Sequence, residues 1–223
     1  MLVNFNGFCG QLSPFQADKI SVWSQENLAS NRDSFIHKYK SYSNPADFVK
    51  KLNFNASFVL WDETRQIIVA ARDFMGFSPL FYSLQKSASD ENYSIRFGFS
   101  VKDLLEVEDF PKEVNLNKVK DYLTWEKRGI EVGSQTFFKN IYRLLPAHAL
   151  VLENGEISIF PYSKLNLDKH IHQPKRFFTD SFEKRFSERI AKHIAPEIKL
   201  AASLSGGLDS SSVTAVAQSL SPK

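Results

Sequence analysis

The chain of 223 residues lacks the features that define several large classes of protein. Cys9 is its only cysteine, which excludes internal disulfides and cysteine-based metal clusters and favours a reducing compartment. No stretch reaches the roughly 18 apolar residues of a membrane span, and residues 1–5 lack the basic start of a signal peptide. The net charge is only +3, with acidic and basic residues interspersed. These absences predict a cytoplasmic protein that binds neither nucleic acid nor membrane.

Hydrophobic residues make up 43% of the chain and include 20 phenylalanines, enough for a substantial core. The N-terminal half contains four short runs rich in Phe, Val, Ile and Tyr, separated by short polar segments. This composition is typical of strands, and the short connections favour an antiparallel sheet. The four strands are predicted at residues 57–61, 66–72, 80–84 and 93–99.

Weaker signals surround these strands. Residues 1–12 predict an edge strand, and the polar, weakly periodic residues 14–42 predict a loop with a short helix. Residues 45–52 predict a helix that has proline in its first turn, and residues 119–123 predict another. Asn154-Gly155 lies between two apolar runs and predicts a hairpin that closes the first domain.

A polar linker is predicted at residues 162–175. His170 and His172 lie within it, but no carboxylate or cysteine accompanies them at metal-ligand spacing, so a solvated loop is favoured over a metal site. Beyond the linker, apolar residues recur every fourth position, which predicts one apolar face of a helix that ends before Pro196. These residues are Phe178, Phe182, Phe186, Ile190 and Ile194.

Residues 198–204 predict a buried strand, which leads into the segment Leu-Ser-Gly-Gly-Leu-Asp-Ser-Ser at residues 204–211. Its two glycines permit positive φ and a close approach of backbone to ligand. A helix that begins near Asp209 would direct unpaired backbone N–H groups at that ligand, as phosphate-binding helices do. No Gly-Lys-Ser/Thr follows the glycines, so this is not a Walker P-loop. The alternative is a plain strand-to-helix turn capped by Asp209.

The segment at residues 204–211 resembles the PP-loop of the ATP-pyrophosphatases, and most of all that of the asparagine synthetase family. Residues 71–82 resemble the Arg-Asp-x-x-Gly-x-x-Pro-Leu-Tyr segment of the class II glutamine amidotransferase domain that precedes the synthetase domain in that family. Residues 136–148 resemble its Thr-x-Phe-x-x-Ile-x-x-Leu-Pro-Pro-Gly-His segment. The resemblance covers nearly all of this chain, but only the opening of the synthetase domain.

This resemblance implies an α+β N-terminal domain, an Ntn-hydrolase-like αββα sandwich, followed by the truncated start of an α/β Rossmann-like PP-loop domain. The expected boundaries are residues 1–162 for the amidotransferase-like domain, 163–176 for the linker and 177–223 for the ATP-binding part. Within the first domain, Arg72-Asp73 is favoured as a structural charged pair at a strand end, and His148 as a structural turn residue.

The sequence departs from the family where glutamine would be hydrolysed. When the two glycines of the family start, Cys-Gly-Ile-x-Gly, are aligned with Gly7 and Gly10, Asn6 occupies the place of the nucleophilic cysteine. An amide side chain cannot attack glutamine. The Arg-Gly and Asn-Gly-Glu segments that bind glutamine are also absent, which predicts a pseudo-glutaminase that docks the synthetase. A working glutaminase that begins at Cys9 after processing is the remaining alternative.

The implied function is an ATP-dependent amide-forming ligase, in which a substrate carboxylate becomes an acyl-adenylate and is then attacked by ammonia or an amine. The expected partners are ATP, Mg²⁺, and aspartate or a peptide or amino-acid derivative. A C-terminal synthetase fragment is a further possible partner. Glutaminase-dead relatives such as lasso-peptide cyclases and β-lactam synthetases suggest peptide cyclisation as one outcome. The alternative is a non-catalytic pseudo-glutaminase scaffold, or a truncated remnant, that binds a partner chain.

The resemblance also assigns roles within the loop. The backbone amides of Ser205, Gly206 and Gly207 are expected to hold pyrophosphate, with Leu204 near the AMP moiety. Asp209 is the expected catalytic residue and Mg²⁺ ligand, and Ser210 is expected to cap the helix and touch phosphate. The ATP-binding residues are therefore predicted to be Leu204, Ser205, Gly206, Gly207, Leu208, Asp209 and Ser210.

Overall fold

The computed structural model describes residues 3–9, 14–24, 32–52, 56–86, 93–108, 110–124, 132–166, 168–194 and 201–221. The chain divides into two compact units, Met1–Lys164 and Leu165–Lys223. Within the described residues, no helix combines the length and the hydropathy that a membrane crossing requires.

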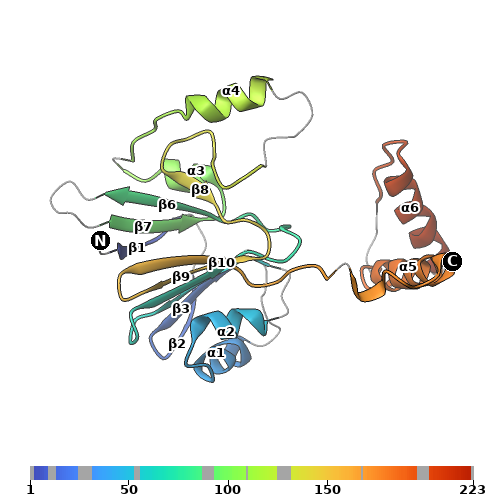
Figure 1. Ribbon diagram of the computed structural model, residues 1–223, viewed down its shortest axis with the longest axis horizontal. Coiled ribbons are helices and arrows are strands. Elements are labelled where there is room, and N and C mark those ends of the chain that lie inside the picture. The colour runs from blue at the N-terminus through green and yellow to red at the C-terminus, as the bar shows by residue number, and fades with distance from the viewer. Residues whose placement is uncertain are drawn as a thin grey trace. The chain divides into compact units, whose positions relative to one another are not determined.

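The first unit contains two β-sheets (Figure 1). The four-stranded sheet has the order β1 (Val3–Phe8), β7 (Tyr93–Gly98), β6 (Phe81–Lys86) and β8 (Ile141–Arg143). The six-stranded sheet has the order β10 (Glu156–Pro161), β9 (His148–Glu153), β5 (Ile67–Ala71), β4 (Phe58–Asp62), β3 (Ile20–Ser24) and β2 (Phe15–Ala17). The strand pairs are antiparallel except for β1 and β7, which are parallel.

Helices cover the outer faces of both sheets, as Figure 1 shows. Between the sheets, Val59 and Ile68 of the larger sheet pack in one buried cluster with Phe97 of the smaller. Helices α1 (Arg32–Lys40) and α2 (Pro45–Lys50) share a second cluster with the larger sheet. Helix α3 (Val101–Leu105) packs on the smaller sheet, and α4 (Leu116–Thr124) follows it in the chain. The layer order of this unit is therefore αββα, as predicted.

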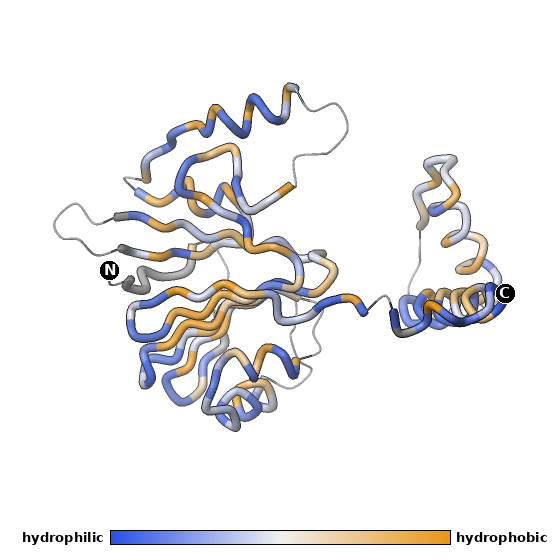
Figure 2. The backbone as a smooth tube through the Cα atoms, viewed as in Figure 1, coloured by the Kyte–Doolittle hydropathy of each residue, from blue (hydrophilic) through white to orange (hydrophobic). Residues whose placement is uncertain are grey.

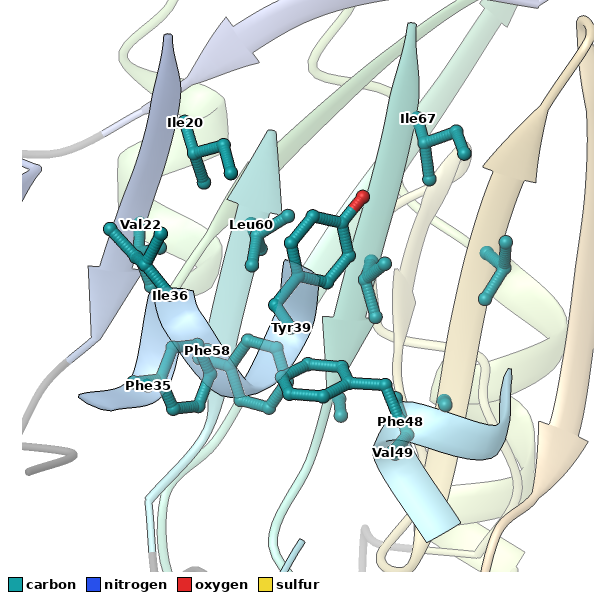
Figure 3. Close-up of a cluster of buried hydrophobic side chains, with 14 residues drawn as sticks. Ile20, Val22, Phe35, Ile36, Tyr39, Phe48, Val49, Phe58, Leu60 and Ile67 are labelled. Carbon is teal, nitrogen blue, oxygen red and sulfur yellow. The ribbon is translucent and has the colours of Figure 1, made fainter. Parts of the chain in front are cut away.

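Aromatic side chains fill the core under α1 and α2 (Figure 3). Phe35 meets Phe48 and Phe58 edge to face, with ring centroids 5.4 Å and 5.2 Å apart. Each such pair contributes about 0.5–1.5 kcal/mol beyond the area it buries. The Tyr39 hydroxyl donates to Asp62 Oδ2 at 3.0 Å, so this buried polar group is satisfied. Figure 2 shows hydrophobic residues along the strands that supply this core.

The prediction of only loop and short helix for residues 14–42 was wrong, because β2 and β3 lie there beside α1. Ile20 and Val22 are buried and alternate with less buried neighbours, but the run is short. The connecting turn uses Asp18 and Lys19, both with positive φ, in place of the Asn-Gly pair that marks such a turn. The four strands predicted at residues 57–61, 66–72, 80–84 and 93–99 are confirmed to within about two residues as β4, β5, β6 and β7, and the predicted hairpin is confirmed as β9 and β10. The edge strand predicted at residues 1–12 is found at Val3–Phe8, while residues 1–2 and 10–13 lie outside the described residues.

The second unit contains the short 3₁₀ helix Asp168–His170, α5 (Lys175–Ala191) and α6 (Leu208–Leu220). The helix predicted from the apolar repeat is confirmed as α5. Part of the strand predicted at residues 198–204 lies outside the described residues, and residues 201–204 form no strand. A strand requires a neighbour for its hydrogen bonds, and the described residues of this unit contain no other strand.

Candidate functional site

The Gly-Gly turn that precedes α6 has the backbone that the sequence predicted. Gly206 has φ of +80°, in the left-handed region that favours glycine. A Cβ atom at Gly206 would meet no atom within 4 Å, so the backbone conformation, and not crowding, requires glycine there. Gly207 is the residue that caps the start of α6, in an extended conformation. The turn therefore leaves open space beside Gly206.

Two serine hydroxyls close the turn. The Oγ atoms of Ser205 and Ser210 are 3.1 Å apart, and Ser210 Oγ also accepts from the backbone N–H of Ser205 at 3.3 Å. The backbone N–H of Gly207 donates to Ser205 Oγ at 3.4 Å. These contacts are long for hydrogen bonds and are made to rotatable hydroxyls. The sequence predicted a role only for the backbone amide of Ser205 and none for its side chain. A serine on each side of the Gly-Gly turn was nevertheless a visible sign that the two hydroxyls could meet.

The first backbone amides of α6 are free of protein acceptors. No side chain caps the helix, so the capping role predicted for Ser210 was wrong, and the alternative of a plain turn capped by Asp209 is not what the structure has either. Ser210 Oγ instead donates to the carbonyl of Gly207 at 3.2 Å. In the described part of the chain, the N–H groups of Leu208, Asp209 and Ser210 have no acceptor. Free amides and the positive end of the helix dipole suit an anion.

The side chains around the turn are exposed. Leu204 and Leu208 are 62% and 82% exposed, and Asp209 lies in the first helical turn with its carboxylate accessible. The described residues contain no group of three or more His, Cys, Asp or Glu residues at metal-binding distances. Asp209 is therefore the one carboxylate that the turn itself offers to a cation.

In the first unit, Arg72 and Asp73 stabilise the turn between β5 and β6. The Asp73 carboxylate accepts from the backbone N–H groups of Phe77 and Ser78, both at 2.9 Å. Arg72 donates to the carbonyl of Gly76 at 2.8 Å, and also to that of Leu144 at 3.0 Å. Both charged side chains are buried and bind backbone groups, which supports the structural interpretation.

The contacts of His148, which follows the turn at Pro146 and Ala147 as the first residue of β9, support its structural interpretation. Its Nδ1 lies 2.8 Å from the carbonyl oxygen of Pro146, which fixes Nδ1 as the protonated nitrogen. Ala147 between them has φ of +57°, in the left-handed region. The family motif has glycine at this position, so the chain keeps the backbone shape without the residue that adopts it most easily.

The surroundings of Cys9 do not favour a reactive thiolate. Its thiol is half-buried beside Leu104 and Phe110, and burial is the main cause that raises its pKa. Arg96 lowers that pKa and Asp103 raises it, but the net direction is upward. The backbone N–H of Cys9 donates to the carbonyl of Phe97 at 2.7 Å. Asn6 lies in β1, and its side chain is outside the described residues.

Comparison with known proteins defines the class of this chain. Residues 22–163, well over half of the chain, match the glutamine amidotransferase domain family. Residues 181–223 match the asparagine synthase family. The chain therefore belongs to the asparagine synthetase family, as its amidotransferase domain and the beginning of its synthase domain.

Individual relatives agree with this assignment. Asparagine synthetase [glutamine-hydrolyzing] 3 of Bacillus subtilis is 30% identical over 86% of this chain and 30% of its own length. Amidase chry2 of Gibberella zeae is 28% identical over 95% of this chain and 30% of its own. The chain thus spans about 30% of the length of these relatives. A solved glutamine phosphoribosylpyrophosphate amidotransferase from B. subtilis aligns loosely with this chain, over 94% of this chain and 46% of its own, with a TM-score of 0.38 and 11% identity.

Proposed function

We propose that this chain supplies the amidotransferase-like domain and the phosphate-binding loop of an ATP-dependent amide-forming ligase. The observation that supports this most is the free backbone N–H groups of Leu208, Asp209 and Ser210 beside the left-handed Gly206. They lie within the residues that match the asparagine synthase family. The triphosphate of ATP is the anion that this chemistry requires.

The proposed reaction has two displacements. A carboxylate oxygen of the substrate attacks the α-phosphorus of ATP; a new O–P bond forms, and the bond between the α-phosphorus and the bridging oxygen breaks to release pyrophosphate. The nitrogen of ammonia or an amine then attacks the acyl carbon. The C–O bond to AMP breaks, AMP leaves, and the nitrogen loses a proton. The product is an amide.

The residues of the loop stabilise the leaving pyrophosphate in this scheme. The free N–H groups of α6 would donate hydrogen bonds directly to its negative oxygens. Ser210 Oγ accepts from the backbone N–H of Ser205 at 3.3 Å, and Ser205 Oγ accepts from that of Gly207 at 3.4 Å. A change of side-chain rotamer at the two serines would release both amides to phosphate. Such preorganised donors act where negative charge develops. Leu204 and Leu208, both exposed, offer apolar surface to the nucleotide.

Asp209 fits the role of an Mg²⁺ ligand. Its exposed carboxylate lies in the same helical turn as the free amides, and Mg²⁺ is commonly held by one or two carboxylates together with phosphate oxygens and water. When bound, the metal would neutralise charge on the phosphates. One protein carboxylate is enough for an Mg²⁺ ion held in this way, and Asp209 is the carboxylate that the turn offers.

We also propose that the amidotransferase-like domain does not hydrolyse glutamine. Asn6 stands where the family has its nucleophilic cysteine, and a carboxamide is not a nucleophile at neutral pH. The raised pKa of Cys9 leaves its thiol protonated and therefore poorly reactive. The attacking nitrogen then comes from free ammonia or from an amine of the substrate, as peptide cyclisation would require.

Pyrophosphate release from ATP tests the proposal, measured on the full-length natural protein. Asp209→Ala should abolish release, whereas Glu183→Ala, which removes an exposed carboxylate on α5, should leave it unchanged. Release with aspartate and ammonia but not with glutamine would support a synthetase with an inactive glutaminase. Release only with a peptide or amino-acid derivative would indicate a cyclase. No release with any substrate would leave the non-catalytic scaffold as the better interpretation.

A further inference from the structure

The hairpin β9–β10 leaves one edge of the six-stranded sheet open, because β10 is the terminal strand in the described residues. Asn154 and Gly155 form its two-residue turn, with φ of 52° and 77°, which makes Glu153 and Glu156 the hydrogen-bonded pair that closes the turn. Hydrogen bonding then alternates along the strand, and the bond from Tyr162 N–H to the Ala147 carbonyl at 2.9 Å agrees with this alternation.

This register determines which backbone groups of β10 face outward. Glu156, Ser158 and Phe160 direct their backbone groups to β9, whereas Ile157, Ile159 and Pro161 direct theirs away from the sheet. The outer edge therefore offers the N–H groups of two isoleucines and the carbonyl groups of three residues. Proline has no N–H, so Pro161 ends the row of donors. The edge suits a short added strand.

A pocket lies beside this edge. It is open, has a volume of about 530 Å³ and is lined by Tyr82, Leu84, Tyr142, Ile157 and Ile159, with Gly155 and Glu156 at the turn. The rings of Tyr82 and Tyr142 stack with centroids 5.4 Å apart. Ile157 packs against the cluster between the sheets, while Ile159 is 47% exposed. A residue paired with Ile159 on an added strand would direct its side chain to this same face.

The closing pair of the turn carries two negative charges. Glu153 and Glu156 are directly opposite each other in the register, and like charges in this position are unfavourable. Neither carboxylate has an ion pair or a side-chain hydrogen bond within the described residues. A positively charged side chain next to Glu156 would relieve this repulsion.

We propose that the β10 edge and the adjacent pocket bind an extended peptide by β-strand addition. Its backbone pairs with Ile157 and Ile159, and an aromatic or branched aliphatic side chain enters the pocket beside Tyr82 and Tyr142. A lysine or arginine follows next to Glu156. Main-chain hydrogen bonds provide affinity in this mode of recognition, and the alternate side chains provide specificity. This surface lies in the first unit and includes none of the residues proposed to bind ATP.

A synthetic peptide tests the proposal. Acetyl-Thr-Thr-Phe-Thr-Val-Lys-amide, added antiparallel, places Phe opposite Ile159, Val opposite Ile157 and Lys opposite Glu156. Binding to the full-length protein is measured by calorimetry, and backbone hydrogen exchange reports which amides become protected. We expect slower exchange at Ile157 and Ile159. The same peptide N-methylated at Phe and Val keeps its side chains but loses its inward-facing donors, and should bind at least tenfold more weakly.

Two matched variants of the protein complete the test. Ile159→Pro removes an outward donor without touching the bonds to β9, whereas Ile159→Val keeps the donor and most of the side chain. We expect the proline variant alone to lose binding, with both variants keeping the circular dichroism spectrum of the parent. Equal binding of the N-methylated peptide, or no protection at Ile157 and Ile159, would overturn the proposal. Self-association that Ile159→Pro abolishes, without peptide binding, would assign the edge to a second copy of the chain instead.

Discussion

Gly76 lies where the turn between β5 and β6 meets the segment before β9, and replacing it with alanine should destabilise the first unit in two ways. Its φ of +73° is in the left-handed region, which costs an alanine about 1–2 kcal/mol. A Cβ atom there would also lie 2.7 Å from Pro146 Cγ and 3.1 Å from Arg72 Nη2. Relief of such overlap costs about 1–3 kcal/mol. The two costs add to about 2–5 kcal/mol, and a less flexible unfolded chain offsets about 0.4–1 kcal/mol of this, so we expect Gly76→Ala to lower the free energy of unfolding by about 2–4 kcal/mol.

Gly133 provides a matched control for this prediction. Its φ is +76°, but a Cβ atom there would meet nothing within 4 Å. Gly133→Ala should therefore lower the free energy of unfolding only through the cost of positive φ. We expect a loss of about 1 kcal/mol, because the less flexible unfolded chain of the alanine variant offsets part of that cost. The difference between the two variants measures the contact between Gly76 and Pro146.

Urea unfolding followed by tryptophan fluorescence is the appropriate assay, because Trp23, Trp61 and Trp125, the chain's three tryptophans, all lie in the first unit. The signal therefore reports the unit in which both glycines lie. Equal losses of stability in Gly76→Ala and Gly133→Ala would refute the argument from close contact. A loss in neither would refute the argument from φ as well.

Three further predictions concern the same unit. Ala147→Gly should raise the free energy of unfolding by about 1 kcal/mol in urea titrations, because φ of +57° suits glycine better than alanine; a less stable variant would contradict this. Asp73→Asn should lower it by about 1–3 kcal/mol, because an amide nitrogen would then face one of the N–H groups of Phe77 and Ser78; an unchanged midpoint would count against the assigned role. Burial, and to a lesser degree Tyr142, raises the pKa of Tyr82 to about 12. Its contribution to stability should be complete below pH 10 and lost between about pH 10 and pH 12, so Tyr82→Phe should flatten the decline of melting temperature across that window.

The sequence predicted those parts of the fold in which local pattern and tertiary packing agree. Strands β4 and β5 are apolar runs bounded by polar turns, and Asn154-Gly155 has the turn chemistry that its hairpin requires. Strands β2 and β3 were missed because the second turn position, where glycine is usual, is Lys19, which adopts a positive φ that its residue type does not favour. Their conformation is stabilised by the sheet around them and is not visible in the local sequence.

The candidate site was predicted less completely than the fold. The Gly-Gly turn and the helix after it follow from the sequence, since φ of +80° at Gly206 requires glycine. The contacts of Ser205 and Ser210 depend on side-chain rotamers that no motif specifies. The absence of a side-chain cap on α6 could not be predicted from a sequence in which Asp209 and Ser210 are both good capping residue types.

Transfer of oxygen from the substrate carboxylate tests the central claim most directly. Turnover by the full-length protein with an ¹⁸O-labelled carboxylate substrate, ATP and its amine would be followed by mass spectrometry of the nucleotide product. Attack on the α-phosphorus predicts AMP that carries one ¹⁸O atom, with unlabelled pyrophosphate. Formation of ADP, with the label in inorganic phosphate, would show attack on the γ-phosphorus and would contradict the proposed function.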